Sequence, residues 1–202
     1  MHALLKRRGV IAALLLALVG LGALALLLTG AGQNSEAPRG GPITMASTDG
    51  AFSLSHLTED QIAVVSFGYT SCPDVCPITL AMKRQALAQF DESIRERIVP
   101  VMITVDLERD TLARLREYVS AFGDEFIGLV GTPDELEDVA KRYGVVWQRK
   151  EATDSTMAYT VDHTAGLFLV NREGVILERV LYSPTPSALV SALDRELERG
   201  TG

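Results

Sequence analysis

Residues 62–77, IAVVSFGYTSCPDVCP, combine the features of a buried strand, a short loop and the start of a helix. The first eight residues form a compact apolar run, which is typical of a strand covered on both faces. Pro77 favours the first turn of a helix, and apolar residues at helical spacing follow it. The loop in between carries Cys72 and Cys76, the two cysteines of the chain. The stretch therefore predicts two thiols presented at the carboxyl end of a buried strand.

The pattern on either side extends this unit into a mixed sheet flanked by helices. Alternating runs around Asp49 and Gly50 predict an N-terminal hairpin. We expect strands at residues 98–105, 126–130, 145–149, 167–170 and 175–180, and helices at 111–122, 132–143 and 187–198. Helix-linked strands indicate parallel pairs, and the hairpin at 167–180 adds an antiparallel one. The predicted fold class is α/β, a thioredoxin-like mixed sheet with helices on both faces and an N-terminal hairpin extension.

Two of the predicted helices show an apolar face at helical spacing. In the helix at 111–122, and again in the helix at 187–198, three residues of one face should point to the core. These residues are Leu112, Leu115 and Val119 in the first helix and Leu189, Leu193 and Leu197 in the second.

The N-terminal segment predicts a membrane anchor. Residues 1–8 include Lys6, Arg7 and Arg8, and residues 9–30 form an uncharged apolar segment, long enough at roughly 30 Å to cross a bilayer as a helix. Residues 31–42 then form a linker to a folded domain at 43–199. Because basic residues stay in the cytoplasm, we expect a single-pass protein of a bacterial inner membrane with its domain on the periplasmic side. Small residues at 29–32 also fit a signal-peptide cleavage site, so removal of the segment is an alternative.

The overall charge argues against one class of partner. The chain has 202 residues and a formal net charge of −7. Nucleic-acid binding calls for a basic surface, so we expect no nucleic-acid partner.

Two thiols with three residues between them have three chemical interpretations. A structural disulfide would close a very short loop and remove little entropy from the unfolded chain, so we favour a functional pair. Cys76 lies where a helix begins, and the N–H groups there stabilise a thiolate, as both disulfide exchange and metal binding require. Structural zinc usually takes four nitrogen or sulfur ligands. A Cu(I) ion accepts two thiolates and one further donor.

His163 is the best candidate for that further donor. It precedes the hairpin at 167–180, and in a thioredoxin-like sheet this segment passes close to the thiol loop. A hydrogen-bonded structural histidine is the alternative. His56 should be an exposed loop residue, and His2 lies before the apolar segment.

Three segments together resemble the Sco family, also called SenC or PrrC. They are GYTSCPDVCP at 68–77, DLERDT at 106–111 and YTVDHT at 159–164. The resemblance spans residues 43–198 and implies that Cys72, Cys76 and His163 bind copper, as Cu(I), Cu(II) or both. It implies a membrane-anchored metallochaperone that delivers copper to, or prepares the thiols of, the dinuclear copper site in cytochrome c oxidase subunit II. Thiol reductants would be further partners.

Residues near these motifs have two interpretations each. Asp106 and Asp110 keep the family spacing and either support the site or dock a partner, or else end a strand and cap a helix. Asp162 either orients His163 or closes a turn. Met82 should pack in the core, whereas Met157 is a weaker candidate for approaching the site. Leu107 and Leu112 stand where the family often has proline.

A second function belongs to a different class. A thiol–disulfide reductase of the same fold would use Cys72 and Cys76 as redox-active thiols. Dithiol exchange needs no third ligand, so His163 favours the metallochaperone, which is not an enzyme. A peroxidase is a third alternative, and no residue pattern selects for it.

Overall fold

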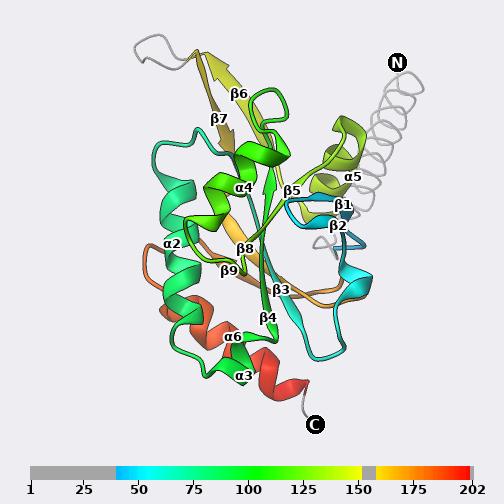
Figure 1. Ribbon diagram of the computed structural model, residues 1–202, viewed down its shortest axis with the longest axis vertical. Coiled ribbons are helices and arrows are strands. Elements are labelled where there is room, and N and C mark those ends of the chain that lie inside the picture. The colour runs from blue at the N-terminus through cyan, green and yellow to red at the C-terminus, as the bar shows by residue number, and fades with distance from the viewer. Residues whose placement is uncertain (1–39, 152–157, 201–202) are drawn as a thin grey trace, which may run out of the picture. The chain divides into compact units, whose positions relative to one another are not determined.

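The computed structural model describes residues 40–151 and 158–200, and its centre is a seven-stranded sheet (Figure 1). The strand order is β2-β1-β5-β4-β3-β8-β9. The strands are β1 (Thr44–Ser47), β2 (Gly50–Ser53), β3 (Ile62–Gly68), β4 (Ile98–Thr104), β5 (Ile127–Val130), β8 (Gly166–Val170) and β9 (Ile176–Leu181). β3, β4 and β5 are parallel and the other pairs are antiparallel. The predicted mixed sheet and its N-terminal hairpin are thus confirmed.

Helices cover both faces of the sheet. They are α2 (Val75–Leu87), α3 (Glu92–Arg95), α4 (Leu112–Ser120), α5 (Pro133–Tyr143) and α6 (Ser187–Arg199), with a 3-10 turn η1 (Leu54–His56). α2, α4 and α6 pack on one face, and α5 packs on the other. α5 begins with a capping box of Thr132 and Glu135. It ends at Gly144, whose φ of 68° is left-handed and suits glycine.

β3 is the strand on which both halves of the core meet. All seven of its residues are buried. Val64 packs with α2 and α6, whereas Val65 on the opposite face packs with α5. This is the expected behaviour of a central strand with helices on each side, and it holds the thiol loop at a rigid edge.

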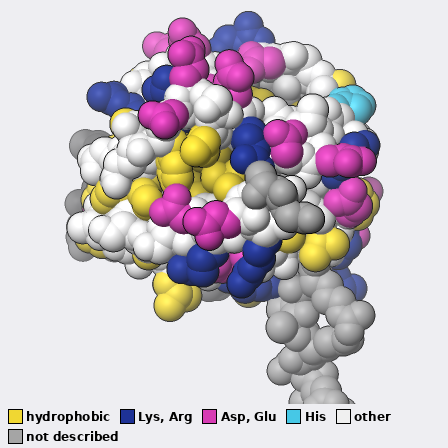
Figure 2. All heavy atoms as spheres, turned by 90° about the horizontal axis from the view of Figure 1, so that it is seen from below, with side chains coloured by type: hydrophobic (Ala, Val, Ile, Leu, Met, Phe, Trp, Pro, Cys, Tyr) yellow, Lys and Arg dark blue, Asp and Glu magenta, His cyan; other side chains and the backbone are white. Residues whose placement is uncertain are grey.

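The helix faces follow the predictions with one exception. Leu115 and Val119 of α4 are buried, and so are Leu189, Leu193 and Leu197 of α6. Leu112 is 38% exposed, so its predicted place in the core is wrong. It is the first residue of α4, where the helix has only begun to pack on the sheet. In Figure 2, which views the end of the domain with α3 and α6, charged side chains of both signs surround a smaller hydrophobic area.

The segment around His163 differs most from expectation. A second sheet consists of two antiparallel strands, β6 (Trp147–Glu151) and β7 (Tyr159–His163). β6 starts two residues later than predicted, and β7 was not predicted as a strand. Its residues are alternately buried and more exposed over only five positions, which is too short a pattern to stand out.

The predicted anchor at residues 9–30, most of the linker at 31–42, and Met157 lie outside the described residues. Within residues 40–151 and 158–200, no helix combines the length and the apolar character needed to cross a membrane. The described domain belongs to a compact unit from Pro38 to Gly202.

Lys83 is a fully buried amine in the core. Its side chain leaves α2 toward the sheet, and its Nζ donates 2.8 Å hydrogen bonds to Val64 O, Ser66 Oγ and Val101 O. Burial lowers the pKa of Lys83 well below its usual value. The three acceptors favour the protonated amine and offset part of this effect.

We expect Lys83→Met to change how stability depends on pH. Between the lowered folded pKa and about 10.4, the unfolded wild type binds more protons than the folded wild type. Its free energy of unfolding therefore rises with pH in that window, by up to about 1.4 kcal/mol per pH unit. This contribution to stability is lost as the pH falls through the window. The variant lacks this slope in chemical denaturation at several alkaline pH values. Lys141→Met, an exposed change in α5, is the control. Parallel pH curves for wild type and Lys83→Met would contradict the assignment.

Candidate metal centre

The two thiols lie in the loop between β3 and α2. Cys76 is in the first turn of α2, and Cys72 lies four residues before it. The Cys76 N–H points to Cys72 Sγ at 3.4 Å, and the Cys72 N–H donates to Tyr69 O at 3.2 Å. Gly68 lets the helix approach this closely, because a Cβ there would lie 2.9 Å from Cys76 Sγ. The thiols are free, so the structure shows the reduced pair.

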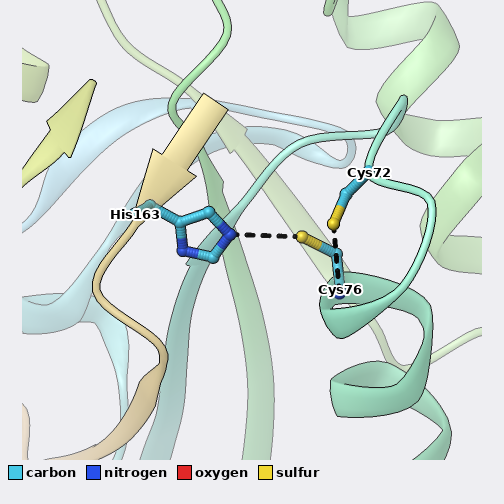
Figure 3. Close-up of side chains that lie close together, drawn as sticks. All are labelled: Cys72, Cys76 and His163. Carbon is cyan, nitrogen blue, oxygen red and sulfur yellow. Dashed lines mark hydrogen bonds between the residues drawn. The ribbon is translucent and has the colours of Figure 1, made fainter. Parts of the chain in front are cut away.

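His163 approaches the thiols from the end of β7. Its Nε2 atom lies 3.4 Å from Cys76 Sγ, and Figure 3 shows the imidazole pointing at the sulfur. One donor atom from each of Cys72, Cys76 and His163 falls within 4.8 Å of the others. A third ligand from a distant segment completes a compact donor set. Two soft sulfurs and one imidazole suit copper better than zinc, which usually takes four protein ligands in structural sites.

The two sulfurs differ in their electrostatics. Hydrogen bonds from the Cys76 thiol, from His163 and from the backbone N–H groups of Asp74 and Cys76 lower the pKa of Cys72 well below its usual range. The interaction with Cys72 and burial raise the pKa of Cys76, which is 4% exposed. We expected the start of the helix to stabilise the Cys76 thiolate. The expectation was wrong because the N–H groups of this turn point to Cys72.

Asp110 supports the thiol loop through Thr70, which lies two residues before Cys72. Its buried carboxylate accepts hydrogen bonds from the Thr70 N–H at 2.9 Å and the Thr70 hydroxyl at 2.6 Å. It also accepts one from the Thr104 hydroxyl at the end of β4, at 2.6 Å. Thr111 caps α4, so the capping interpretation of Asp110 is wrong. Asp110 instead ties the residues before Cys72 to the neighbouring strand.

Asp106 connects the loop after β4 to β7. Its carboxylate accepts hydrogen bonds from the Tyr159 hydroxyl at 2.7 Å and from Arg109 Nε at 2.5 Å. Asp106 and Asp110 are 4% and 2% exposed. Neither is available for direct contact with a partner, so support of the site is the role that the geometry favours.

The other candidates lie apart from the donor set. Asp162 forms an ion pair with Lys150, and the Nδ1 atom of His163 lies 3.2 Å from Thr164 O instead. Asp162 therefore does not orient the imidazole. Met82 is 2% exposed and packs in the core with α6, as predicted. His56 is exposed on η1, also as predicted.

Aromatic residues lie next to His163. Tyr69 meets the His163 ring edge to face, with ring centroids 6.1 Å apart. Trp147 pairs with His163 across the hairpin and lines a cavity of about 410 Å³ with Leu107 and Leu136. No sequence pattern indicated a role for Arg109, whose guanidinium lies over the Tyr159 ring, 3.7 Å from its centroid.

Comparison with known proteins gives concordant matches. A model of the SCO1/SenC family matches residues 31–198. A SCO2-like protein of Rickettsia conorii is 30% identical over 190 residues, covering 89% of this chain and 92% of that protein. The mitochondrial SCO1 homolog 1 of Arabidopsis thaliana is 36% identical over 138 residues, and the match covers 68% of this chain but 41% of that protein. The crystal structure of Arabidopsis thaliana ScoI with copper bound has a TM-score of 0.70 and 32% identity, covering 79% of this chain and 98% of that one.

The family model covers residues 31–198 and thus includes the thiol loop and the His163 segment. The thioredoxin-like fold predicted from the sequence is the fold of the matched structures. By fold, by sequence and by the segments that form the donor set, the chain belongs to the SCO1/SenC family.

Proposed function

We propose that this protein is a copper metallochaperone that binds one copper ion through Cys72, Cys76 and His163. The observation that carries the proposal is the convergence of two thiols and an imidazole within 4.8 Å. The copper-bound structure of the Arabidopsis relative supports it. Two thiolates hold Cu(I), and the imidazole adds a nitrogen donor that Cu(II) favours. The ion is cargo, so a three-ligand site leaves it accessible for transfer.

The proposed recipient is the dinuclear copper site in cytochrome c oxidase subunit II or a similar copper-site protein. The support for it is the resemblance of the three motif segments to the Sco family. The partly exposed side of the site is Cys72, whereas Cys76 is buried. We propose that the recipient's ligands approach at Cys72, and that the ion leaves the buried sulfur last.

We further propose that the domain is held at a bacterial inner membrane, on the periplasmic side, by residues 9–30. The support is the basic triplet and the length of the apolar segment. The periplasm tolerates disulfides, so the thiols would need a reductant there before they bind copper.

A thiol–disulfide reductase is the second candidate, and the asymmetry of the sulfurs favours it. Cys72 is partly exposed and its pKa is lowered, as an attacking thiolate requires. It would attack a substrate disulfide and release one substrate thiol. Cys76 would then displace the second substrate thiol and form the Cys72–Cys76 disulfide. The substrate gains two electrons and two protons from the pair.

The redox state of the thiols should control copper binding. We expect residues 38–202 to bind one copper per chain when reduced and almost none when Cys72–Cys76 is oxidised, because a disulfide removes both thiolates. Equilibrium dialysis with metal analysis measures the stoichiometry. Equal copper retention by the oxidised protein would exclude the assigned site.

His163→Ala should separate the two candidate functions. We expect copper affinity to fall by more than the roughly 10–100-fold that changes around the ligands typically cost, because a ligand itself is lost. The Cu(II) form should be affected most, with a changed charge-transfer absorption. His56→Ala, an exposed change outside the site, is the matched control.

The same variant should still form the Cys72–Cys76 disulfide and keep its fold, as measured by thiol titration and thermal unfolding. Unchanged copper affinity and spectrum would return His163 to a structural role. Retained reductase activity together with unchanged copper binding would place the reductase first.

The N-terminal segment should stay on the mature protein. We expect mass spectrometry of the membrane-extracted chain to show residues 9–30 intact, since their apolar length exceeds that of ordinary signal peptides. A mature chain that begins near Ala31 or Gly32 would identify a cleaved signal.

A further inference from the structure

The third ligand stands on a hairpin that the main sheet does not hold. Among the described residues, β6 and β7 pair with each other and with no strand of the seven-stranded sheet. The thiols, by contrast, stand at the end of β3, which is hydrogen bonded to β4 and β8. The distance from His163 to the thiols is therefore not set by a shared ladder. The chain connects His163 to β8, which begins three residues later, and side-chain contacts from the loop after β4 and from the end of β3 add to this connection.

Arg109 connects the loop after β4 to Tyr159 of β7 and to the ring of Tyr69. Its Nε donates to Asp106, in its own loop, and its Nη1 donates to the Tyr159 backbone oxygen at 3.2 Å. The guanidinium lies flat against the Tyr159 ring at 3.7 Å and 5.6 Å from the Tyr69 ring. The Tyr159 hydroxyl returns to Asp106 at 2.7 Å. A planar, always charged group is suited to combine these contacts.

Tyr69 makes the second connection, at Val161, which lies two residues nearer to His163 along β7 than Tyr159 does. Its hydroxyl accepts the Val161 N–H at 3.2 Å, and its ring lies edge to face against His163. Tyr69, Tyr159 and Val161 are 2%, 6% and 6% exposed, so water does not replace these contacts freely. Residues 159, 161 and 163 share one face of β7, because side chains alternate along a strand. Fixing Tyr159 and Val161 thus fixes the direction of His163.

We infer that Arg109 and Tyr69 are positioning residues for the third copper ligand. Neither is one of the ligands, and both act through β7 on the place of the His163 ring. The inference rests on the proposed function, since it assigns these residues to the same copper site. Changes in groups that orient metal ligands typically lower metal affinity about 10–100-fold.

The first test is Arg109→Lys in the full-length protein. Lysine keeps the charge but lacks the planar fork that stacks on Tyr159 and reaches both acceptors. We expect Cu(II) affinity to fall about tenfold or more, with altered nitrogen hyperfine coupling in electron paramagnetic resonance. The rate of Cys72–Cys76 disulfide formation should stay unchanged.

Arg97→Lys is a matched control. Arg97 pairs with Asp60 at 3.2 Å, donates to the Leu197 backbone oxygen at 3.4 Å and is 18% exposed, against 22% for Arg109. It lies away from the copper site, beside α6. We expect Arg97→Lys to leave copper affinity and the nitrogen signal unchanged. An equal loss of copper affinity in both variants would mean that general destabilisation is the cause, and would overturn the inference.

A double variant tests whether Arg109 acts through His163. In the His163→Ala background, Arg109→Lys should change copper affinity by no more than about twofold, because two changes that act through the same group are not additive. A further loss of tenfold in that background would show that Arg109 affects the thiols directly, and would overturn the positioning role. Wild-type affinity of Arg109→Lys in the presence of His163 would also overturn it.

Tyr69→Phe tests the second connection with a smaller change. The ring stays and the hydroxyl that holds the Val161 N–H is lost. We expect weaker Cu(II) binding and an altered nitrogen signal, whereas Tyr143→Phe should leave both unchanged. The Tyr143 hydroxyl also bonds a backbone atom, Gly41 O at 2.8 Å, but in the core. A wild-type copper signal in Tyr69→Phe would remove Tyr69 from the assignment.

The result for His163→Ala separates failure of this inference from failure of the proposed function. If His163→Ala binds copper like the wild type, the copper site itself is wrong, and the positioning role falls with it. If His163→Ala loses affinity but both Arg109→Lys and Tyr69→Phe do not, the proposed function stands and the positioning role alone is wrong.

Discussion

A single close approach, 3.4 Å between Cys76 Sγ and His163 Nε2, depends on most of the structure around it. The two residues are 87 positions apart and stand on elements that share no strand ladder. The thiol side is held rigidly, because β3 is buried on both faces and Gly68 allows α2 to start directly above it. The imidazole side stands on a strand outside that sheet, where side-chain contacts from Arg109 and Tyr69 reach β7 at Tyr159 and Val161. The position of the third donor of the proposed copper site therefore depends on packing and hydrogen bonding outside the ligands themselves.

The two sulfurs have different roles because their surroundings differ. Cys72 collects hydrogen bonds from its neighbour and from the start of α2, and it remains partly exposed. Cys76 is buried between Cys72 and the imidazole of His163. The arrangement favours a thiolate at the partly exposed Cys72, while Cys76 is buried. The same asymmetry suits both proposed functions, metal transfer and thiol–disulfide exchange, which are compatible at one site because copper binding requires the reduced thiols.

Two buried carboxylates divide the support of the site between them. Asp110 holds the segment before Cys72 through Thr70 and Thr104. Asp106 holds the hairpin side through Tyr159 and Arg109. Each carboxylate is stabilised in the interior by hydrogen bonds from several donors, as a buried charge requires. One carboxylate thus supports the segment that carries the thiols, and the other supports the strand that carries His163.

Local sequence patterns determined the strands, the helices, the thiol loop and the choice of His163, since these follow from periodicity and residue chemistry within short windows. β7 and its separate sheet needed the tertiary structure, because a five-residue half-buried strand has too little pattern. The tertiary structure was also needed to decide which thiol has the lowered pKa. The position of the helix alone indicated Cys76, whereas the N–H groups at the start of the helix point to Cys72. No sequence pattern indicated that Arg109 contacts the His163 strand, because the contact exists only once Tyr159, 50 residues later, packs against it.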